Sequence, residues 1–327
     1  MGILMGLNIL SLCDGMACAR IALERCNIKV DNYFASEIKE IAIKCATTNY
    51  PDIIEIGNVK NVSYQNGILK TEKGNFEIDH FDLVCFGFPC QTLSIAMPTD
   101  KRIGLKNLEK SGLFYECYRI LKEVNPPFFF IENVASMKEE NKKLLSELIG
   151  CEPVKIDSQV CAPAMRKRLY WTNLPHTPFV KDDSITLTSV LDNGWVNRKK
   201  ARALLAGSDG GLNSWRHMPA RFRRYYYSRF DNLVFESEEN FNKCLELTEP
   251  YIKLSAKEFK EQTANDEELI KETSKARVLS KTEMEKCMTV PVGYTNMLTR
   301  DEAYNVLGDG WTIDVICHFF EHLTEIK

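Results

Sequence analysis

The stretch that decides the fold is Asp82–Gln91, which reads DLVCFGFPCQ. Its apolar first half is typical of a buried strand, and it ends at Cys90, beside Pro89, which stiffens the backbone. In open α/β sheets, ligands bind at the carboxyl ends of the strands. The stretch therefore predicts a strand that delivers a thiol to the functional edge of a sheet.

Two further segments place polar groups beside apolar runs in the same way. Phe128–Ile131 is followed by Glu132-Asn133-Val134, and Arg166 and Arg168 come just before Leu169–Trp171. Taken alone, Glu132 could cap a helix and the arginines could be surface charges. One thiol, one carboxylate and two guanidiniums together predict nucleophilic chemistry on a polar, planar substrate.

Residues 7 to about 175 alternate apolar runs with amphipathic segments, which predicts βαβ units and a parallel sheet covered on both faces. This alternation ends after Pro175, and an apolar pattern returns at Thr289. We therefore expect a catalytic domain of residues 1–175 and 289–327, interrupted by an insert at 176–288. The expected strands are Leu7–Cys13, Val30–Ala35, Ile53–Ile56, Phe81–Phe86, Phe128–Ile131 and Leu169–Thr172. The expected helices are Ala17–Cys26, Ile38–Asn49, Leu113–Val124 and Lys138–Ile149.

The composition of the 327 residues is ordinary for a globular protein, with 44% hydrophobic and 27% charged residues and a net charge of -3. The twelve cysteines form no C-x-x-C pairs and there are only five histidines, so we expect no metal site. The apolar start lacks a positive n-region, and no run is long enough to span a bilayer. These features predict a soluble, cytoplasmic protein with no membrane partner.

The turn after the first expected strand predicts a nucleoside site. Asp14-Gly15-Met16-Ala17 follows Cys13, and Glu37 follows the second strand, about where an acid meets ribose hydroxyls in nucleotide-binding sheets. Ala17 and Arg20 occupy the later glycine positions of G-x-G-x-x-G, which disfavours NAD and FAD and favours a nucleoside without phosphates, such as S-adenosyl-L-methionine. The alternative is an ordinary strand–turn–helix with a solvated Glu37.

With these motifs in order, the chain resembles the cytosine-C5 DNA methyltransferases. The matching segments are Ile9–Ala17, Ser36-Glu37, Gly57–Val59, Gly87–Gln91, Ser111–Phe114, Glu132–Val134, Arg166–Arg168 and Gly308–Val315. The resemblance implies an α/β fold: a Rossmann-like class I methyltransferase sheet with helices on both faces, plus a smaller inserted target-recognition domain.

The resemblance also implies roles for individual residues. Cys90 would be the nucleophile, Glu132 would hold the N3 edge of cytosine, and Arg168, with Arg166 beside it, would orient the base. The residues implied for S-adenosyl-L-methionine are Cys13, Asp14, Gly15, Met16, Glu37, Ile38, Asn58, Val59, Gly87, Pro89, Leu113, Asp309 and Trp311.

Three positions depart from the family pattern. Cys13 stands where an aromatic residue is usual, Asn58 where aspartate is common, and Ala164 where glutamine is often found. An amide at position 58 can still pair with adenine. Ala164 and the tail from Val290–Asn296 to Trp311 are similar to the animal de novo methyltransferases.

The chemistry of the family explains these residue types. A thiolate that adds to C6 makes the poorly nucleophilic C5 of cytosine electron-rich through a covalent intermediate. Nearby arginine favours the thiolate by lowering the thiol pKa, and a desolvated, protonated Glu132 would donate to N3. Because neighbouring bases cover C6 in a duplex, the target must flip out of the helix.

The insert contains a basic and aromatic segment, Trp215–Tyr227. Guanidiniums mixed with aromatic rings can neutralise phosphates and reach base edges, and the alternative is a solvated basic face or a subunit contact. We expect DNA contacts from Gln91, Arg216, Arg221, Arg223 and Arg224. Alanine at Arg221 or Arg223 is expected to weaken DNA binding and its dependence on salt.

The favoured function is a DNA (cytosine-5-)-methyltransferase that uses S-adenosyl-L-methionine, with double-stranded DNA and a cognate restriction endonuclease as expected partners. A tRNA cytosine-5 methyltransferase on the same frame is the nearest alternative, although its Cys-Phe-Thr signature is absent. An inactive DNA-binding relative is disfavoured because this chain keeps Cys90 and Glu132.

Overall fold

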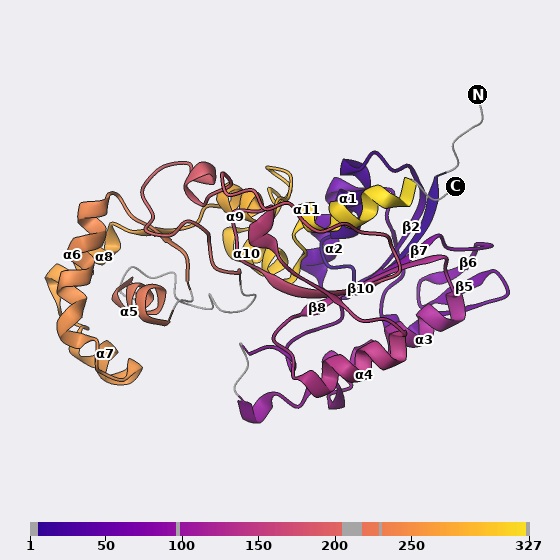
Figure 1. Cartoon of the computed structure of the whole chain (residues 1–327), viewed down its shortest axis with the longest axis horizontal. Coiled ribbons are helices and arrows are strands. Elements are labelled where there is room, and N and C mark those ends of the chain that lie inside the picture. Colours follow the sequence, from indigo (N-terminus) through magenta and orange to yellow (C-terminus); the bar gives the residue numbers. More distant parts are fainter. Residues whose placement is uncertain (1–5, 96–98, 205–217, 229–230, 325–327) are drawn as a thin grey trace. The chain divides into compact units, whose positions relative to one another are not determined.

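The computed structural model describes residues 6–95, 99–204, 218–228 and 231–324 (Figure 1). The chain divides into two compact units. Unit 1 contains Met1–Ser158, Arg166–Val180 and Gly310–Lys327, and unit 2 contains Gln159–Met165 and Lys181–Asp309. The division differs from the boundary expected at residue 289, because α10 (Arg300–Asp309) packs on α9 (Lys281–Cys287) within unit 2.

A seven-stranded sheet forms the centre of the described part of unit 1, in the order β3-β2-β1-β7-β8-β10-β9. Its strands are β1 (Leu7–Leu12), β2 (Val30–Ser36), β3 (Ile54–Glu55), β7 (Leu83–Phe86), β8 (Phe128–Val134), β9 (Val154–Asp157) and β10 (Lys167–Thr172). The pairs from β3 to β8 are parallel, whereas β10 is antiparallel to both neighbours. The strand order reverses between β1 and β7, which is where open α/β sheets bind ligands.

Helices cover both faces of this sheet, which confirms the expected fold class. On one face lie α1 (Cys18–Arg25), α2 (Glu40–Asn49) and α11 (Ile313–Phe320), and on the other lie α3 (Phe114–Val124) and α4 (Glu139–Ile149) (Figure 1). Side chains alternate accordingly along β8: Ile131 packs into the core under α3 and α4, while Phe130 meets Phe319 of α11 at 5.3 Å between ring centroids.

The local sequence of α3 explains its position and its end. Phe114, Cys117, Ile120 and Leu121 recur at helical spacing and are buried against the sheet. The helix stops at Asn125, which adopts a left-handed φ of 46° and is followed by two prolines. This stop turns the chain directly into β8.

A second, antiparallel sheet was not expected from the sequence. It contains β4 (Ser63–Gln65), β5 (Ile68–Thr71) and β6 (Gly74–Glu77). The dipeptide Asn66-Gly67 turns β4 into β5 with φ values of 52° and 73°, the pattern of a tight hairpin turn. Phe76 packs edge-on against Phe34 of β2, with ring centroids 5.2 Å apart, so this sheet is attached to the main one.

Unit 2 is largely helical in its described residues. Its elements include α5 (Met218–Arg223), the π-helical turn Arg224–Ser228, β11 (Leu233–Val234), α6 (Glu238–Thr248), α7 (Ala256–Gln262), α8 (Glu267–Ser274) and β12 (Arg277–Val278), followed by α9 and α10. Its core is aromatic: Phe222, Tyr225, Phe235 and Phe241 pack together. Phe222 and Tyr225 of the basic and aromatic segment thus belong to the core of unit 2.

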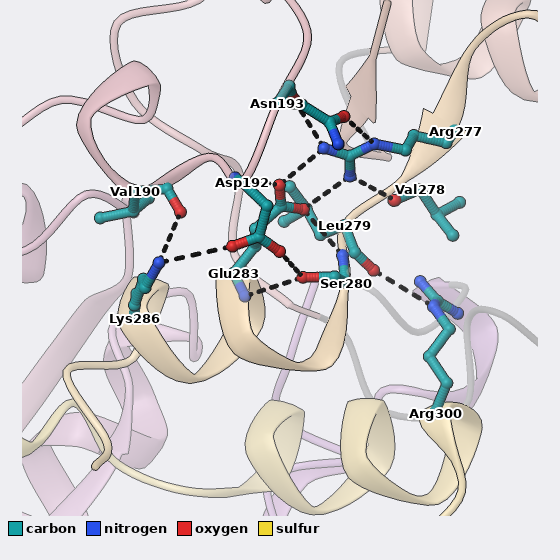
Figure 2. Close-up of polar contacts among 10 residues, drawn as sticks. All are labelled: Val190, Asp192, Asn193, Arg277, Val278, Leu279, Ser280, Glu283, Lys286 and Arg300. Atoms are coloured by element: carbon teal, nitrogen blue, oxygen red, sulfur yellow. Dashed lines mark hydrogen bonds and ion pairs between the residues drawn. The ribbon is translucent and has the colours of Figure 1, made fainter. Parts of the chain in front are cut away.

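A polar network fixes β12 and α9 to the loop before Asn193 (Figure 2). Glu283 is 0% exposed, and both of its oxygens accept from Arg277 at 2.7 Å. The backbone N–H groups of Asp192 and Ser280 also donate to Glu283, at 2.9 and 2.8 Å, and Arg277 donates to the carbonyl oxygen of Asn193. Glu283 is a buried charge with a full set of donors, which is the condition under which such burial is tolerated.

Within the described ranges, no helix is both long enough and apolar enough to cross a membrane.

Candidate active site

The expected site residues meet at one edge of the main sheet. The carboxyl ends of β1, β7 and β8 lie there because these strands are parallel, and the antiparallel β10 begins at the same edge. β7 leads into Gly87–Gln91, and β10 carries Arg168 immediately after Arg166 and Lys167. The topology thus brings the thiol, the carboxylate and both guanidiniums to one edge.

Glu132 and Arg168 form an ion pair across β8 and β10. Arg168 Nε lies 2.6 Å from Glu132 Oε1, and the side chains are only 12% and 9% exposed. Tyr170 stands opposite Glu132 in the register, so Arg168, two residues earlier, projects from the same face. Both residues lie inside their strands, whereas the sequence placed them just outside. The strands fix the positions of both charged groups.

Arg166, just before β10, is a buried cation at this sheet edge. It is 4% exposed and donates to the carbonyl oxygen of Gly310 at 2.6 Å. Burial, reinforced by the positive charge of Arg168, lowers the pKa of Arg166 to about 10, while negative charge on Glu132, Tyr170 and Cys90 opposes this shift. Arg166 therefore stays charged at neutral pH and interacts electrostatically with both Glu132 and Cys90.

The loop that carries the half-buried thiol of Cys90 is anchored on its C-terminal side. The Cys90 carbonyl oxygen accepts from the N–H groups of Leu93 and Ser94, each at 2.9 Å. The buried Thr92 hydroxyl donates to the carbonyl oxygen of Gly104 at 2.8 Å and lies 2.7 Å from the Ser111 hydroxyl. Ser111 belongs to a segment matched by the resemblance, and the structure shows why it matters: it holds this loop.

Asn133 is a functional residue to which the sequence analysis assigned no role. It is 1% exposed, its amide donates to the carbonyl oxygen of Phe88 at 2.9 Å, and its oxygen accepts from the N–H of Val134. The amide thereby ties β8 to the backbone immediately before Pro89-Cys90. The position of Asn133 between Glu132 and Val134 in the E-N-V motif was the sequence signal that could have indicated this role.

Gly87 allows an unusually close approach at the end of β7. A Cβ atom there would lie 2.6 Å from Trp311 Nε1 and 3.2 Å from Glu132 Oε2. The Trp311 ring is held against Phe130 at 5.4 Å, and its backbone N–H lies 3.2 Å from Cys18 Sγ. Trp311, far away in the sequence, therefore lies beside Glu132.

The turn after β1 is open at Gly15, and its backbone binds the carboxylate of Glu37. Gly15 has a φ of +64°, and a Cβ at this position would have no heavy atom within 4 Å among the described residues. The half-buried Glu37 accepts from the N–H groups of Gly15, Ile38 and Lys39 at 2.8, 2.7 and 2.9 Å. Its carboxylate is thus held by the backbone of the turn and not merely solvated.

The other expected cofactor residues differ in exposure. Met16 and Val59 are buried in the core, Pro89 and Leu113 are half-buried, and Ile38 is 64% exposed. Cys13 has a left-handed φ of 52°, and its Sγ lies 4.0 Å from Cys117 Sγ on α3. Asn58 begins a turn in which its side-chain oxygen accepts from the N–H of Lys60 at 3.0 Å. Asp309 ends α10 in unit 2, so its role stays a prediction.

Asp14 points toward buried hydroxyls. Its Oδ1 accepts from Tyr33 at 2.6 Å, and its Oδ2 is buried with no hydrogen-bond partner in the described structure. Burial raises the pKa of Asp14 to about 7, with a smaller contribution from Glu37, although the hydroxyls of Ser11 and Tyr33 act in the opposite direction. The turn therefore contains an acid that titrates near neutral pH.

Replacing Asp14 with asparagine should stabilise the protein at neutral and higher pH. A carboxyl whose pKa is raised in the folded state costs stability as pH rises from its unfolded pKa, 3.8, to about 7. We expect a gain of about 2 kcal/mol in the free energy of unfolding at pH 8, discounted for partial exposure, and no gain at pH 3.5. Urea unfolding at the two pH values measures this, and an equal effect at both would contradict the assignment.

The arginines expected to contact DNA serve unit 2 itself. Arg221 is 1% exposed, so its guanidinium is not available to a phosphate, which corrects the expected role. Arg223 donates to the carbonyl oxygen of Leu254 at 2.5 Å and lies over the ring of Phe259, and Arg224 is 3.3 Å from Asp231. Arg216 lies outside the described residues. Gln91 is exposed beside Cys90, in keeping with an accessible position.

The sheet order and the helices on both faces define a Rossmann-like methyltransferase fold, and solved structures agree. DNMT2 of Spodoptera frugiperda superposes with a TM-score of 0.62 at 18% identity, covering 98% of this chain and 100% of that one. The Entamoeba histolytica methyltransferase EhMeth gives 0.61 at 17% identity, covering 98% of each chain. At such identities the likeness shows the fold alone.

Residues 7–150, a little under half of the chain, match the family model for C-5 cytosine-specific DNA methylase. The type II methyltransferase M.NgoBV of Neisseria gonorrhoeae is 29% identical over 213 residues, covering 58% of this chain and 47% of the relative. M.HpaII of Haemophilus parainfluenzae is 30% identical over 175 residues, covering 50% and 44%. The matched segments thus span less than half the length of these relatives.

Proposed function

We propose that the protein is a DNA (cytosine-5-)-methyltransferase that uses S-adenosyl-L-methionine. The observation that carries the proposal is the position of Arg166, a buried cation that interacts electrostatically with both Cys90 and Glu132 at one sheet edge. A cation beside a thiol favours the thiolate, which is the reactive form of cysteine. The family model matched by residues 7–150, C-5 cytosine-specific DNA methylase, supports DNA as the substrate.

The chain's own residues would act as follows. The Cys90 thiolate attacks C6 of a flipped-out cytosine and forms a C–S bond, and the ring electrons displaced by this bond make C5 nucleophilic. Glu132, positioned by Arg168 at 2.6 Å, would act in its protonated form and donate a hydrogen bond to N3, where negative charge develops. Methyl transfer would form a C–C bond at C5, break the S–CH3 bond of the donor and leave S-adenosylhomocysteine. A base then removes the C5 proton and the C–S bond to Cys90 breaks, which returns the thiolate.

The residues at the first turn fit the methyl donor. Bound S-adenosyl-L-methionine would supply an electrophilic methyl group, so the protein needs only to bind and orient it. The open space at Gly15, the carboxylate of Glu37 and the ring of Trp311 would hold it, with Asn58 and Val59 at the adenine. Within the described residues, no group of side chains could hold a metal ion, and the proposed chemistry does not need one.

The experiment uses the full chain with labelled S-adenosyl-L-methionine and separate duplex DNA and tRNA substrates, followed by nucleoside mass spectrometry. Label in 5-methylcytosine from DNA is expected. Label from tRNA alone would select the tRNA methyltransferase, and label in neither, with cofactor binding intact, would select an inactive relative. A cognate restriction endonuclease as a partner stays a prediction that co-expression with neighbouring open reading frames would test.

A further inference from the structure

We infer that Glu72 is a positioning residue for the adenine end of the cofactor pocket; this inference rests on the proposed function. Glu72 lies in the two-residue turn between β5 and β6, in the small sheet that the sequence did not predict. The side chain contacts the loop at residues 57–61, which carries Asn58 and Val59.

Two hydrogen bonds join Glu72 to this loop. Oε1 accepts from the backbone N–H of Asn58 at 3.0 Å, and Oε2 accepts from the side-chain amide of Asn61 at 2.7 Å. These two bonds lower the pKa of Glu72 below its usual value, so the carboxylate is ionised at neutral pH. One side chain therefore holds the backbone at the first residue of the turn and the amide three residues later.

The loop is shaped to accept this carboxylate. Gly57 has a φ of +78°, and a Cβ there would lie 1.9 Å from Glu72 Oε1, so only glycine permits the approach. The Ser36 hydroxyl donates to the Gly57 carbonyl oxygen at 2.7 Å, which fixes the other side of the loop to the end of β2, next to Glu37. The loop is thus held between the end of β2, which lies next to Glu37, and the turn that carries Glu72.

The small sheet that carries Glu72 is anchored to α3 at its first strand, β4. Arg119 of α3 donates to the carbonyl oxygen of Val62 at 2.8 Å, and the N–H of Tyr64 donates to Glu123, also of α3, at 2.9 Å. The Thr71 hydroxyl bridges the tip by donating to Gly74 and accepting from the N–H of Lys73. Because the turn is fixed, the exposed carboxylate of Glu72 can position Asn58 and Asn61 at a small cost in side-chain entropy.

The resemblance to the cytosine-C5 DNA methyltransferases explains why a carboxylate from another segment is useful beside residue 58. Position 58 holds asparagine where aspartate is common, and the side-chain oxygen of Asn58 already accepts from Lys60. The amide nitrogen of Asn58 would therefore donate to adenine N1, provided that the backbone of residue 58 is held in place. Glu72 supplies that restraint through the Asn58 N–H.

Calorimetry of S-adenosylhomocysteine binding to the full chain tests this inference. This ligand lacks the sulfonium charge, so a long-range charge effect of Glu72 is minimised. Glu72→Ala should weaken binding about fivefold to tenfold, because two bonds to a charged acceptor are lost. Glu72→Gln retains one acceptor and should recover most of the affinity, and Glu77→Ala, on β6 of the same sheet, should bind like the wild type.

Two further readouts separate positioning from folding. In methyl transfer, Glu72→Ala should raise KM for S-adenosyl-L-methionine with kcat within about twofold. It should also reduce the preference for the adenine over the hypoxanthine form of the homocysteine ligand. Wild-type-like affinity in Glu72→Ala, or an equal loss in the Ala and Gln variants, would overturn the inference. No binding by the wild type would instead overturn the proposed function.

Discussion

Replacing Cys90 with alanine should reduce methyl transfer by at least about a thousandfold while leaving S-adenosylhomocysteine binding within about twofold. The reason is that the thiolate acts on the base, whereas Gly15, Glu37 and the loop at 57–61 form the expected cofactor site. Denaturing gels and mass spectrometry with 5-fluorocytosine DNA should show a covalent adduct on Cys90 in the wild type and none in the variant.

The control for this experiment is Cys151→Ala, another half-buried thiol in unit 1 whose Sγ lies 4.0 Å from the Thr172 carbonyl oxygen. It should transfer methyl groups at the wild-type rate. If Cys90→Ala retained transfer within tenfold of the wild type, or if the adduct formed on another cysteine, the nucleophile would be wrongly assigned.

The second large effect concerns stability. Arg277→Ala would leave Glu283, 0% exposed, without its bidentate partner (Figure 2). Removing one member of a fully buried pair costs about 3–5 kcal/mol, because the remaining charge stays desolvated. Since Arg277 is itself 34% exposed and two backbone N–H groups still bind Glu283, we expect a loss of about 2–3 kcal/mol here. The loss of the bonds from Arg277 to Asn193 adds to this cost. Urea unfolding should therefore show an early transition for unit 2 in this variant.

The matched control is Lys275→Ala. Lys275 pairs with Glu272 at 2.7 Å, three positions apart, with 35% of the lysine side chain exposed. Such surface pairs contribute about 0–1 kcal/mol, so the control should unfold almost like the wild type. Equal destabilisation by the two variants would show that the bidentate pair has no special role.

The stability of this network should also depend on pH. Burial alone would raise the pKa of Glu283, but Arg277 and the N–H groups of Ser280 and Asp192 outweigh it and hold the pKa below its usual value of 4.5. The stabilisation is therefore complete above the unfolded pKa and is lost as pH falls through the folded pKa. The difference between the wild type and Glu283→Gln should shrink as pH falls below about 4.5.

Most of the main sheet could be predicted because its strands are specified locally, but β9 (Val154–Asp157) and the antiparallel direction of β10 were not predicted. Apolar runs such as Leu83–Phe86 and Phe128–Ile131 match the observed strands, and the helix of residues 114–124 follows from its own spacing. The small sheet was missed although Asn66-Gly67 is a hairpin signal, because β4 to β6 are short and half-exposed, with few apolar residues.

The candidate site was predicted less evenly. Cys90, Glu132, Arg166 and Arg168 are brought together because they sit at strand ends, whose position follows from the order of the βαβ units. Arg221 was misjudged because a charge pattern does not reveal burial, whereas the DNA contacts of Arg223 and Arg224 stay a prediction. Neither Glu72 nor the bond from Asn133 to Phe88 could be predicted, since each depends on a contact between distant segments.

The sequence by itself determined most strands of the main sheet, the helices of its βαβ units and the identity of the groups that reach the sheet edge, because hydrophobic periodicity and turn residues act over a few positions. Only the tertiary structure decided which of those groups touch: Trp311 beside Gly87, Glu72 on the loop at 57–61, and Arg277 around Glu283. The physical reason is that burial and hydrogen-bond partners depend on how separate elements pack together, whether they are six positions apart, as Arg277 and Glu283 are, or far apart in the chain.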